Sequence, residues 1–328
     1  MNGLTARTTR NGPTWRNWAG NVGTRPLRTV APSSTAALAE AVRRAAEDGL
    51  NVKPVGAGHS FTSVAATSGV LLRPERLCGI REIDRERGTV TVAAGTPLKQ
   101  LNEVLAGEGL SLANMGDIMA QTVSGAVSTG THGTGRETAS IAAQIRGLEL
   151  VLADGSVLRC SADEHPEVFT AARIGLGALG VISEITFAVE PVFLLTAREE
   201  PMRFDRVTAE FDQLAAENEH FEFYWFPHTD GCSTKRNNRS AGPAAPLPAY
   251  AAGWTTSCCP TGCSRRRAPW ARPPPARCPR SRSCPAGRCP PVRTRTSRTA
   301  CSPARGGCAS WRWSTRCRAR RPWTRCGR

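Results

Sequence analysis

At 328 residues the chain is long enough to form two domains. Its formal net charge of +16 would favour a nucleic-acid or membrane-surface partner if the charge were evenly spread. It is not: residues 251–328 contain 19 Arg with no Lys and no acidic residue, while residues 1–250 contain 24 Lys and Arg against 27 Asp and Glu, a net of −3. The basic charge therefore belongs to the tail, and the first 250 residues have an ordinary composition.

Cysteine is distributed in the same uneven way. Ten of the 13 cysteines lie in the tail, and only Cys78, Cys160 and Cys232 precede it, which is the low usage expected in a reducing cytoplasm. The N-terminal segment lacks the apolar core of a secretory signal, and no apolar run approaches the ~18–20 residues of a membrane span. We therefore expect a cytoplasmic protein. Peripheral association with a membrane and the oligomeric state stay open.

After an N-terminal arm, residues 1–21, the chain alternates helix and strand signals. The first helix is predicted between Ser33 or Ser34, either of which can cap its start, and Gly49, which can end it in a left-handed conformation. The elements that follow are a strand at 51–55, a glycine-rich turn at 56–60, strands at 69–72 and 89–94, and a helix from Pro97.

Residues 114–135 are rich in Gly, Ser and Thr and have neither helix nor strand periodicity. A segment of this length without regular structure usually carries function, and its apolar residues Ile118, Val123 and Val127 indicate that it packs. The remaining predicted elements are a hairpin turning at Asp154-Gly155, a helix from Pro166, strands at 181–190 and 221–226, and between them a helix near 205–217. This order predicts an α+β fold rather than a doubly wound parallel sheet.

Two loops carry candidate binding chemistry. Gly56-Ala57-Gly58-His59-Ser60 follows a strand, and its glycines let backbone N–H groups converge on an anion such as a phosphate. Residues 128–135 offer hydroxyls and glycine backbone at close spacing. A solvated loop histidine and a polar surface loop are the ordinary alternatives. Two such loops in one α+β block favour a large dinucleotide ligand.

A third pattern, Gly175 to Gly180, matches the Gly-x-Gly-x-x-Gly fingerprint of dinucleotide-binding folds. That fingerprint must follow a strand and open a helix. Here a predicted helix precedes the glycines and a strand follows them. The sequence therefore predicts a close-packed glycine turn, whose backbone can still touch a cofactor.

Several longer motifs, in order along the chain, resemble one enzyme family. NWAGN (17–21), VGAGHSF (55–61), TVSGAVSTGTHGTG (122–135) and LGALGVIS (176–183) are similar to the FAD-linked aldonolactone and alditol oxidases of the vanillyl-alcohol-oxidase type. FEFYWFPHTD (221–230) and KRNNR (235–239) resemble the D-arabinono-1,4-lactone and L-gulono-1,4-lactone oxidase branch. The resemblance runs from about Trp15 to Arg239.

The resemblance implies a two-subdomain FAD-binding domain at 22–192, the start of an α+β cap domain over the flavin at 193–250, and FAD as cofactor. It implies that His59 is bonded covalently to the flavin, and that small Gly116 lies near the reactive flavin carbon and leaves room for oxygen. The residues that would contact FAD are Gly56, Ala57, Gly58, His59, Ser60, Phe61, Gly116, Asp117, Thr122, Gly125, Thr129, Gly130, Thr131, His132, Val181 and Ile182.

The implied reaction is oxidation of a hydroxyl of a sugar-1,4-lactone or polyol, by hydride transfer to flavin N5, with O2 or another acceptor taking the electrons. In relatives the substrate-facing groups include a C-terminal His-Trp-x-Lys motif that this sequence lacks, so the catalytic residues are unknown and we expect little or no activity. The incomplete cap is expected to expose the FEFYWF strand, an aggregation-prone edge. The alternatives are an FAD-dependent reductase or dehydrogenase on the same domain, and a basic-tailed nucleic-acid-binding protein that is not an enzyme.

The tail, residues 251–328, has no Leu, Ile, Phe, Lys or acidic residue, so it is expected to be disordered. In G+C-rich codons read in another frame, residues 254–260 become Asp-Asp-Glu-Leu-Leu-Pro and residues 311–317 become Ala-Val-Val-Asp-Ala-Val-Pro. We therefore predict a frameshift between about Arg239 and Trp254. Because Cys-x-x-Cys spacing is absent and the tail has no His, no metal site is expected. Because Lys and Gly-rich patterning are missing from the tail, no nucleic-acid partner is expected.

Overall fold

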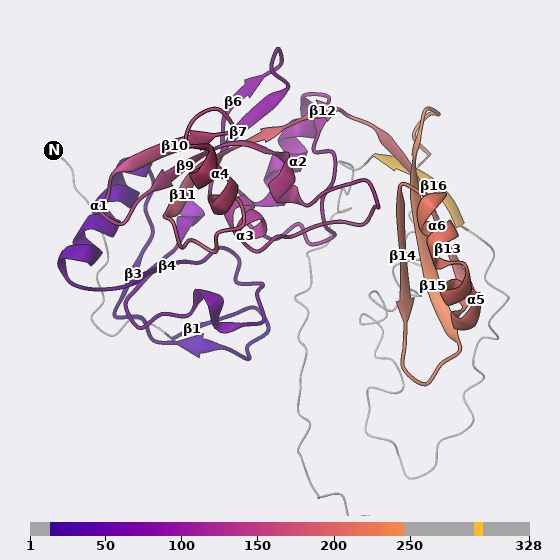
Figure 1. The fold of residues 1–328 in the computed structure, drawn as a ribbon, viewed down its shortest axis with the longest axis horizontal. Coiled ribbons are helices and arrows are strands. Elements are labelled where there is room, and N and C mark those ends of the chain that lie inside the picture. The colour runs from indigo at the N-terminus through magenta and orange to yellow at the C-terminus, as the bar shows by residue number, and fades with distance from the viewer. Residues whose placement is uncertain (1–13, 246–291, 298–328) are drawn as a thin grey trace, which may run out of the picture.

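The computed structural model describes residues 14–245 and 292–297. Helices and strands are mixed, which confirms the predicted α+β fold. The elements up to β12 form a first unit, and the elements from β13 onward form a second unit beside it (Figure 1). None of the helices in the described ranges is long and apolar enough to cross a membrane.

The first unit begins with a small hairpin and a parallel sheet. The hairpin pairs β1 (Trp15–Arg16) with β2 (Gly23–Thr24). The sheet has the order β3 (Arg28–Val30), β5 (Val70–Leu72), β4 (Val52–Pro54), and all its pairs are parallel. The three residues of β5 are all buried, as is usual for the central strand of a parallel sheet.

Helix α1 (Thr35–Glu47) connects β3 to β4, and both of its ends follow the predicted capping chemistry. The Ser34 hydroxyl accepts a hydrogen bond from the Ala37 N–H at 3.1 Å. Gly49 has a φ of 65°, and the next N–H, of Leu50, donates to the Ala45 carbonyl at 2.8 Å.

The larger sheet of the first unit is antiparallel and has five strands. Its order is β10 (Val157–Ser161), β9 (Ile145–Val151), β11 (Val181–Ala188), β7 (Thr89–Ala93) and β6 (Ile80–Asp84). The remaining elements of the unit are α2 (Leu98–Gly107), α3 (Val123–Ser128), α4 (Pro166–Ala172), the paired short strands β8 (Leu110–Ser111) and β12 (Glu190–Pro191), and 3-10 turns at Ser63–Ala65, Pro74–Arg76 and Ile141–Gln144.

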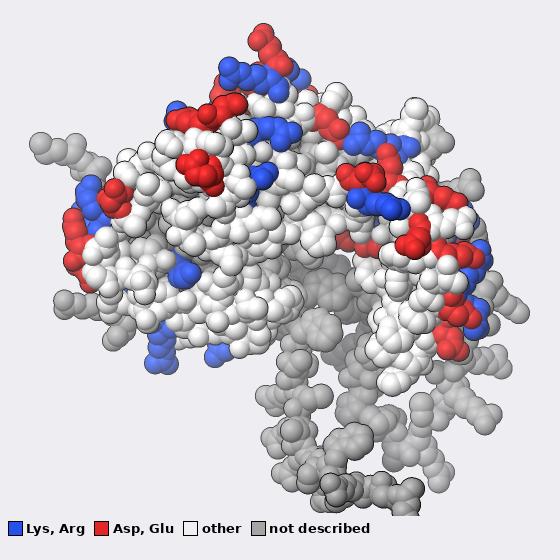
Figure 2. All heavy atoms as spheres, viewed as in Figure 1, with Lys and Arg blue, Asp and Glu red and all other residues white. Residues whose placement is uncertain are grey.

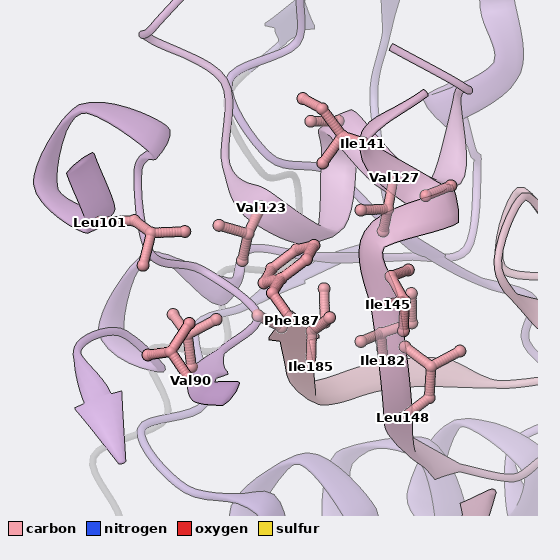
Figure 3. Packing of buried hydrophobic residues seen from close by; sticks show 14 of the residues in the cluster. Val90, Leu101, Val123, Val127, Ile141, Ile145, Leu148, Ile182, Ile185 and Phe187 are labelled. Carbon is pink, nitrogen blue, oxygen red and sulfur yellow. The ribbon is translucent and has the colours of Figure 1, made fainter. Parts of the chain in front are cut away.

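Both faces of the five-stranded sheet are covered. On one face, α2, α3 and α4 bury a core that centres on Phe187 of β11 (Figure 3). On the other face, Leu38 and Val42 of α1 pack against Val151 and Val181, and against Leu72 of the parallel sheet. Each such buried side chain contributes roughly 1.5–3 kcal/mol. Strand β11 is therefore held in the middle of the unit.

The structure corrects the prediction that residues 114–135 lack regular structure, because α3 lies within them. Thr122 caps this helix, its hydroxyl accepting from the Gly125 N–H at 3.2 Å. Gly125 and the serines lower the helix propensity of the segment, which is why the sequence favours a loop. Burial of Val123 and Val127 in the core overrides that preference.

The second unit is a four-stranded antiparallel sheet with two short helices. The strand order is β14 (His220–Trp225), β15 (Gly231–Ser240), β13 (Leu194–Arg203) and β16 (Val292–Ser297). The single helix predicted near 205–217 is instead two, α5 (Phe204–Ala209) and α6 (Phe211–Ala216), which meet at Glu210. Both helices lie along one face of the sheet in Figure 1.

Strand β14 lies at an edge of its sheet, as predicted, and its aromatic residues are partly covered. Phe221 and Phe223 contact the ring of Phe211 at centroid distances of 5.8 and 6.2 Å. Trp225 stacks on Phe204 at 4.9 Å but keeps 42% of its surface exposed. The helices supply ring partners that the strand pattern alone could not reveal.

One segment of the predicted disordered tail is described as a strand. β16 pairs antiparallel with β13 from Val292, opposite Glu199, to Ser297, opposite Leu194. Ladder hydrogen bonds join backbone groups, so an open sheet edge can accept an extended segment whatever its side chains. The rest of residues 251–328 lies outside the described residues.

Candidate functional site

A cavity in the first unit gathers the candidate binding loops. It is open to solvent on one side, and it has about 930 Å³ of empty space when the solvent at its mouth is included. Its walls come from β4 and the loop after it, from the start of α3, from the glycine turn before β11, and from β11 itself. Ten of the sixteen predicted cofactor-contacting residues line it: Gly56, Ala57, Gly58, His59, Ser60, Thr122, Gly125, Thr129, Val181 and Ile182.

The loop after β4 presents free backbone donors to this cavity. Among the residues that the structure describes, none accepts a hydrogen bond from the N–H groups of residues 56–60. Val55, just before them, is bound to the Leu72 carbonyl at 2.8 Å and so anchors the loop to β5. Successive unpaired N–H groups, here called the cradle, are donors of the kind that can bind an anion such as a diphosphate.

Glycine is required at two positions of this loop. A Cβ on Gly56 would overlap the Thr122 hydroxyl, so the loop and the start of α3 approach as closely as backbone allows. Gly58 has a φ of 70°, in the left-handed region, and a Cβ there would lie 3.4 Å from the Trp15 ring. The two glycines bring the cradle against α3 on one side and the N-terminal hairpin on the other.

His59 projects from the same loop, and its imidazole stacks on the Trp18 indole. The ring centroids are 5.2 Å apart and the ring planes differ by 25°. Burial lowers the pKa of His59 below the usual value near 6.5, because desolvation disfavours the charged form. The neutral ring, which carries a nitrogen lone pair, is therefore favoured at neutral pH.

The Gly175–Gly180 turn lies between a helix and a strand, as the sequence predicts, and its Leu176 and Leu179 side chains are exposed. α4 precedes it and β11 follows it, the reverse of a Rossmann context. Leu176 and Gly177 adopt positive φ of 51° and 75°, and both line the cavity. The turn thus faces the site by its backbone without being a nucleotide fingerprint.

Six predicted cofactor residues lie outside the cavity lining: Phe61, Gly116, Asp117, Gly130, Thr131 and His132. Thr131 is connected to it, since its hydroxyl accepts from the Gln121 amide at 3.1 Å and Gln121 lines the cavity. Gly116 faces the backbone at residue 132: a Cβ on it would lie 2.9 Å from the His132 carbonyl oxygen. The contacts of these six with a cofactor remain predictions.

Asp117 links the two units of the structure. The Lys235 ammonium of β15 lies 3.8 Å from the Asp117 carboxylate and 2.9 Å from the Glu222 carboxylate of β14. Burial in itself lowers the pKa of Lys235, but the two carboxylates outweigh it and the pKa is raised. A second link joins the His220 ring nitrogen Nδ1 to the Thr134 carbonyl at 2.7 Å.

Sequence reasoning missed part of the site. The cavity-lining residues that it did not predict are Trp15, Lys53, Pro54, Val55, Thr62, Val64, Ala65, Pro74, Gln121, Ser124, Ser128, Leu176 and Gly177. Most are neighbours of predicted residues, and alternation along strand 51–55 would have indicated some of them. No group of three or more His, Cys, Asp or Glu suited to a metal ion occurs within the described ranges.

Comparison with known proteins defines the class. Residues 26–161 match the FAD binding domain family, and residues 185–258 match the D-arabinono-1,4-lactone oxidase family. The chain is 38% identical to L-gulono-1,4-lactone dehydrogenase of Mycobacterium tuberculosis over 74% of its own length and 55% of that protein's. It is 36% identical to mouse L-gulonolactone oxidase, over 68% and 50% of the two chains.

A fungal relative and a solved structure agree with these matches. D-arabinono-1,4-lactone oxidase of Yarrowia lipolytica is 34% identical over 73% of this chain and 46% of its own. The fold is similar to that of cholesterol oxidase from Brevibacterium sterolicum, with a TM-score of 0.65 at 18% identity, over 72% of this chain and 49% of that one. The chain spans about half the length of the curated relatives it matches.

The family match identifies an FAD-binding flavoprotein. More narrowly, the chain belongs to the FAD-linked aldonolactone oxidoreductases, the family of the gulono- and arabinono-lactone enzymes. The unpaired N–H cradle at 56–60, closed by Thr122, suits the diphosphate of FAD.

Proposed function

We propose that this chain descends from, and retains the cofactor-binding part of, an enzyme that oxidises a hydroxyl of a sugar-1,4-lactone of the D-arabinono or L-gulono type. The observation that carries the proposal is the cradle at 56–60 in the cavity, together with the cap segment that matches the lactone oxidase family. Residues 22–192 are the proposed FAD domain and residues 193–250 the start of the cap.

The described residues account for binding and orientation. The N–H groups of residues 56–60 would hold the diphosphate, and Thr122 and Thr129 add hydroxyls beside it. Val181 and Ile182 offer backbone and apolar surface farther along the cavity wall. When bound, the flavin supplies the hydride acceptor for the substrate carbon. The second unit contacts the first through Lys235 and His220, outside the cavity lining.

The electron acceptor is proposed to be O2, because the vertebrate and fungal relatives are named oxidases and Gly116 is small. The second candidate is a dehydrogenase using another acceptor, favoured by the name of the mycobacterial relative. Reduction of the bound flavin by lactone, followed by reoxidation in air or by a dye, separates the two. Both require FAD binding and neither requires nucleic acid.

The decisive experiment is reconstitution of the full chain with FAD. We expect stoichiometric binding, seen as the visible flavin spectrum after gel filtration, and slow or absent bleaching when gulono- or arabinono-lactone is added without oxygen. The low activity is expected because relatives carry substrate-facing groups in the half that this chain does not match. Failure to bind FAD would refute the proposal, and peroxide formation at a full relative's rate would refute the expected inactivity.

We further propose that a frameshift produced the tail. The match to the lactone oxidase family ends at residue 258, near the change of composition at residue 251. Sequencing the DNA of codons 239–254 tests the idea directly. Restoring the other frame should extend the family match, whereas mass spectrometry of a native protein carrying the Arg-rich tail would contradict it.

A further inference from the structure

The N-terminal hairpin closes over the cavity loop through its turn, residues 17–21. The Trp18 N–H donates to the Gly58 carbonyl at 2.8 Å. Asn17 donates from its amide to the Ser60 carbonyl at 2.9 Å, and Asn21 from its amide to the Phe61 carbonyl at 2.9 Å. The turn therefore holds the carbonyl groups of Gly58, Ser60 and Phe61, while the N–H groups of residues 56–60 stay free for a ligand.

The turn is also held by hydrogen bonds within itself. The Asn17 amide oxygen accepts from the Val22 N–H at 3.1 Å, and its nitrogen also donates to the Asn21 side chain at 2.7 Å. Asn17 is only 4% exposed, although it is polar. A buried amide with its donors and acceptor all used indicates a fixed scaffold rather than a surface turn.

The scaffold also determines where the His59 ring lies. No residue in the described part of the chain forms a hydrogen bond with the His59 imidazole. Its oriented contact is the stack on Trp18, and Trp18 in turn meets the Phe61 ring edge-on at 6.1 Å. Because a hydrogen bond would occupy a ring nitrogen, stacking is the contact that orients the ring and leaves both nitrogens available.

We propose that the 17–21 turn positions His59 for covalent attachment of the flavin, with Trp18 as the positioning residue. This rests on the proposed function and on the predicted bond from His59 to the flavin. In that attachment an imidazole nitrogen loses its hydrogen, the flavin 8-methyl carbon loses one hydrogen, and the N–C bond forms between them. The two hydrogens leave as two protons and one electron pair, all of which O2 takes up to give one H2O2.

The stack contributes to this step through geometry. The stack holds the imidazole in one plane at the edge of the FAD cavity. The ring nitrogen can therefore approach the flavin carbon without a change of the His59 side-chain rotamer. Misplacement of a reacting group by about 1 Å reduces such a step by ~100-fold. Loss of Trp18 should therefore slow attachment far more than it weakens binding of FAD, whose diphosphate contacts lie elsewhere in the loop.

The test uses the full chain expressed without flavin and mixed with FAD. Attachment is followed as flavin fluorescence that stays with acid-precipitated protein, total FAD as the visible spectrum before acid, and folding as the melting temperature. Trp18→Ala should attach flavin ~10- to 100-fold more slowly, with total FAD and melting temperature near the unmodified values. Trp18→Phe, which keeps a stacking ring, should restore most of the rate.

Controls separate the possible failures. His59→Ala lacks the attaching nitrogen and gives the background fluorescence of protein without covalent flavin. Trp225→Ala removes an exposed tryptophan of the second unit and should leave the attachment rate unchanged. Normal attachment in Trp18→Ala, or a loss that merely follows total FAD, would overturn the inference. Non-covalent FAD in the unmodified chain would overturn it while the proposed function stands, whereas no FAD binding at all would overturn both.

Discussion

The two units of the molecule are stabilised in different ways. In the first unit a five-stranded sheet is buried on both faces, and Phe187, Leu101 and Ile145 are at most 1% exposed. In the second unit the helices α5 and α6 cover one face of the sheet, while Trp225 at the end of β14 and the following Phe226 remain 42% and 46% exposed. The cofactor cavity belongs to the first unit.

The difference shows which part of the function each unit can support alone. A site built on a two-sided core is held by packing that does not depend on the rest of the chain. The second unit relies on ring contacts and ion pairs. Charges of both signs are interspersed on the face of the molecule drawn in Figure 2. We therefore expect cofactor binding to survive changes that loosen the cap.

The largest stability effect is expected at the centre of the first unit. Phe187→Ala should lower the free energy of unfolding by ~3–5 kcal/mol, because it empties space in a fully packed core. Denaturant titration monitored by bound-flavin fluorescence measures the loss. Phe187→Leu is the matched control and should lose clearly less. Equal losses for the two would show that the core can collapse around the gap.

A smaller loss of stability, with complete loss of FAD, is expected at Gly56. A valine there would overlap the Thr122 hydroxyl, and forced overpacking costs ~1–3 kcal/mol. The control is Gly107→Ala at the end of α2, where a Cβ meets nothing within 4 Å and the helix should gain ~0.5–1 kcal/mol. FAD binding that survives Gly56→Val would contradict the proposal that residues 56–60 hold the diphosphate of FAD.

In the second unit a similar truncation should matter less. Trp225→Ala removes a stack on Phe204 from a partly exposed strand edge, so the expected loss is ~0.5–1.5 kcal/mol. FAD affinity, measured by fluorescence quenching, should not change. If this variant lost FAD together with stability, the two units would form one cooperative structure and the contrast drawn above would fail.

The smallest effect is expected where the units meet. Lys235→Met removes the ion pairs to Asp117 and Glu222 and should lower stability by ~1 kcal/mol or less, since the pairs are partly solvated. Because the folded-state pKa of Lys235 is raised, its contribution is complete at neutral pH and is lost only above the unfolded lysine value of ~10.4.

Comparison of the melting temperatures of Lys235→Met and the unmodified chain at pH 7 and pH 9 measures this contribution. The difference between the two proteins should be the same at both pH values. Lys99→Met, which removes an exposed pair with Glu103 in α2, is the control and should change almost nothing. A difference that shrinks before pH 9 would contradict the raised pKa.

Local sequence patterns predicted much of this molecule. Ser34 and Gly49 place the ends of α1 because capping depends on neighbours within one helical turn. The Asp154-Gly155 signal is confirmed as the turn between β9 and β10, with Gly155 at a φ of 82°. Gly56 to Ser60 lie in the cavity, as their position after a strand indicates.

Features that depend on distant residues could not be predicted. Helix α3 forms because Val123 and Val127 reach a core contributed by other elements, against their weak local propensity. The hydrogen bond from the Asn17 amide to the Ser60 carbonyl joins residues 43 positions apart, so no periodic pattern in the sequence predicts it. The NWAGN motif indicated a family, but its physical role becomes visible only in the contacts.

The approach of Gly116 to the His132 carbonyl, at 2.9 Å for an added Cβ, has an evolutionary consequence. If position 116 controls oxygen access as proposed, adding a methyl group there to close that access also pushes on the 132 backbone. Conversion between oxidase and dehydrogenase would then require a compensating shift of the neighbouring segment. In this lineage, oxygen reactivity would then depend on the spacing between position 116 and the backbone of residue 132, and a change of the side chain at position 116 alone would not convert one activity into the other.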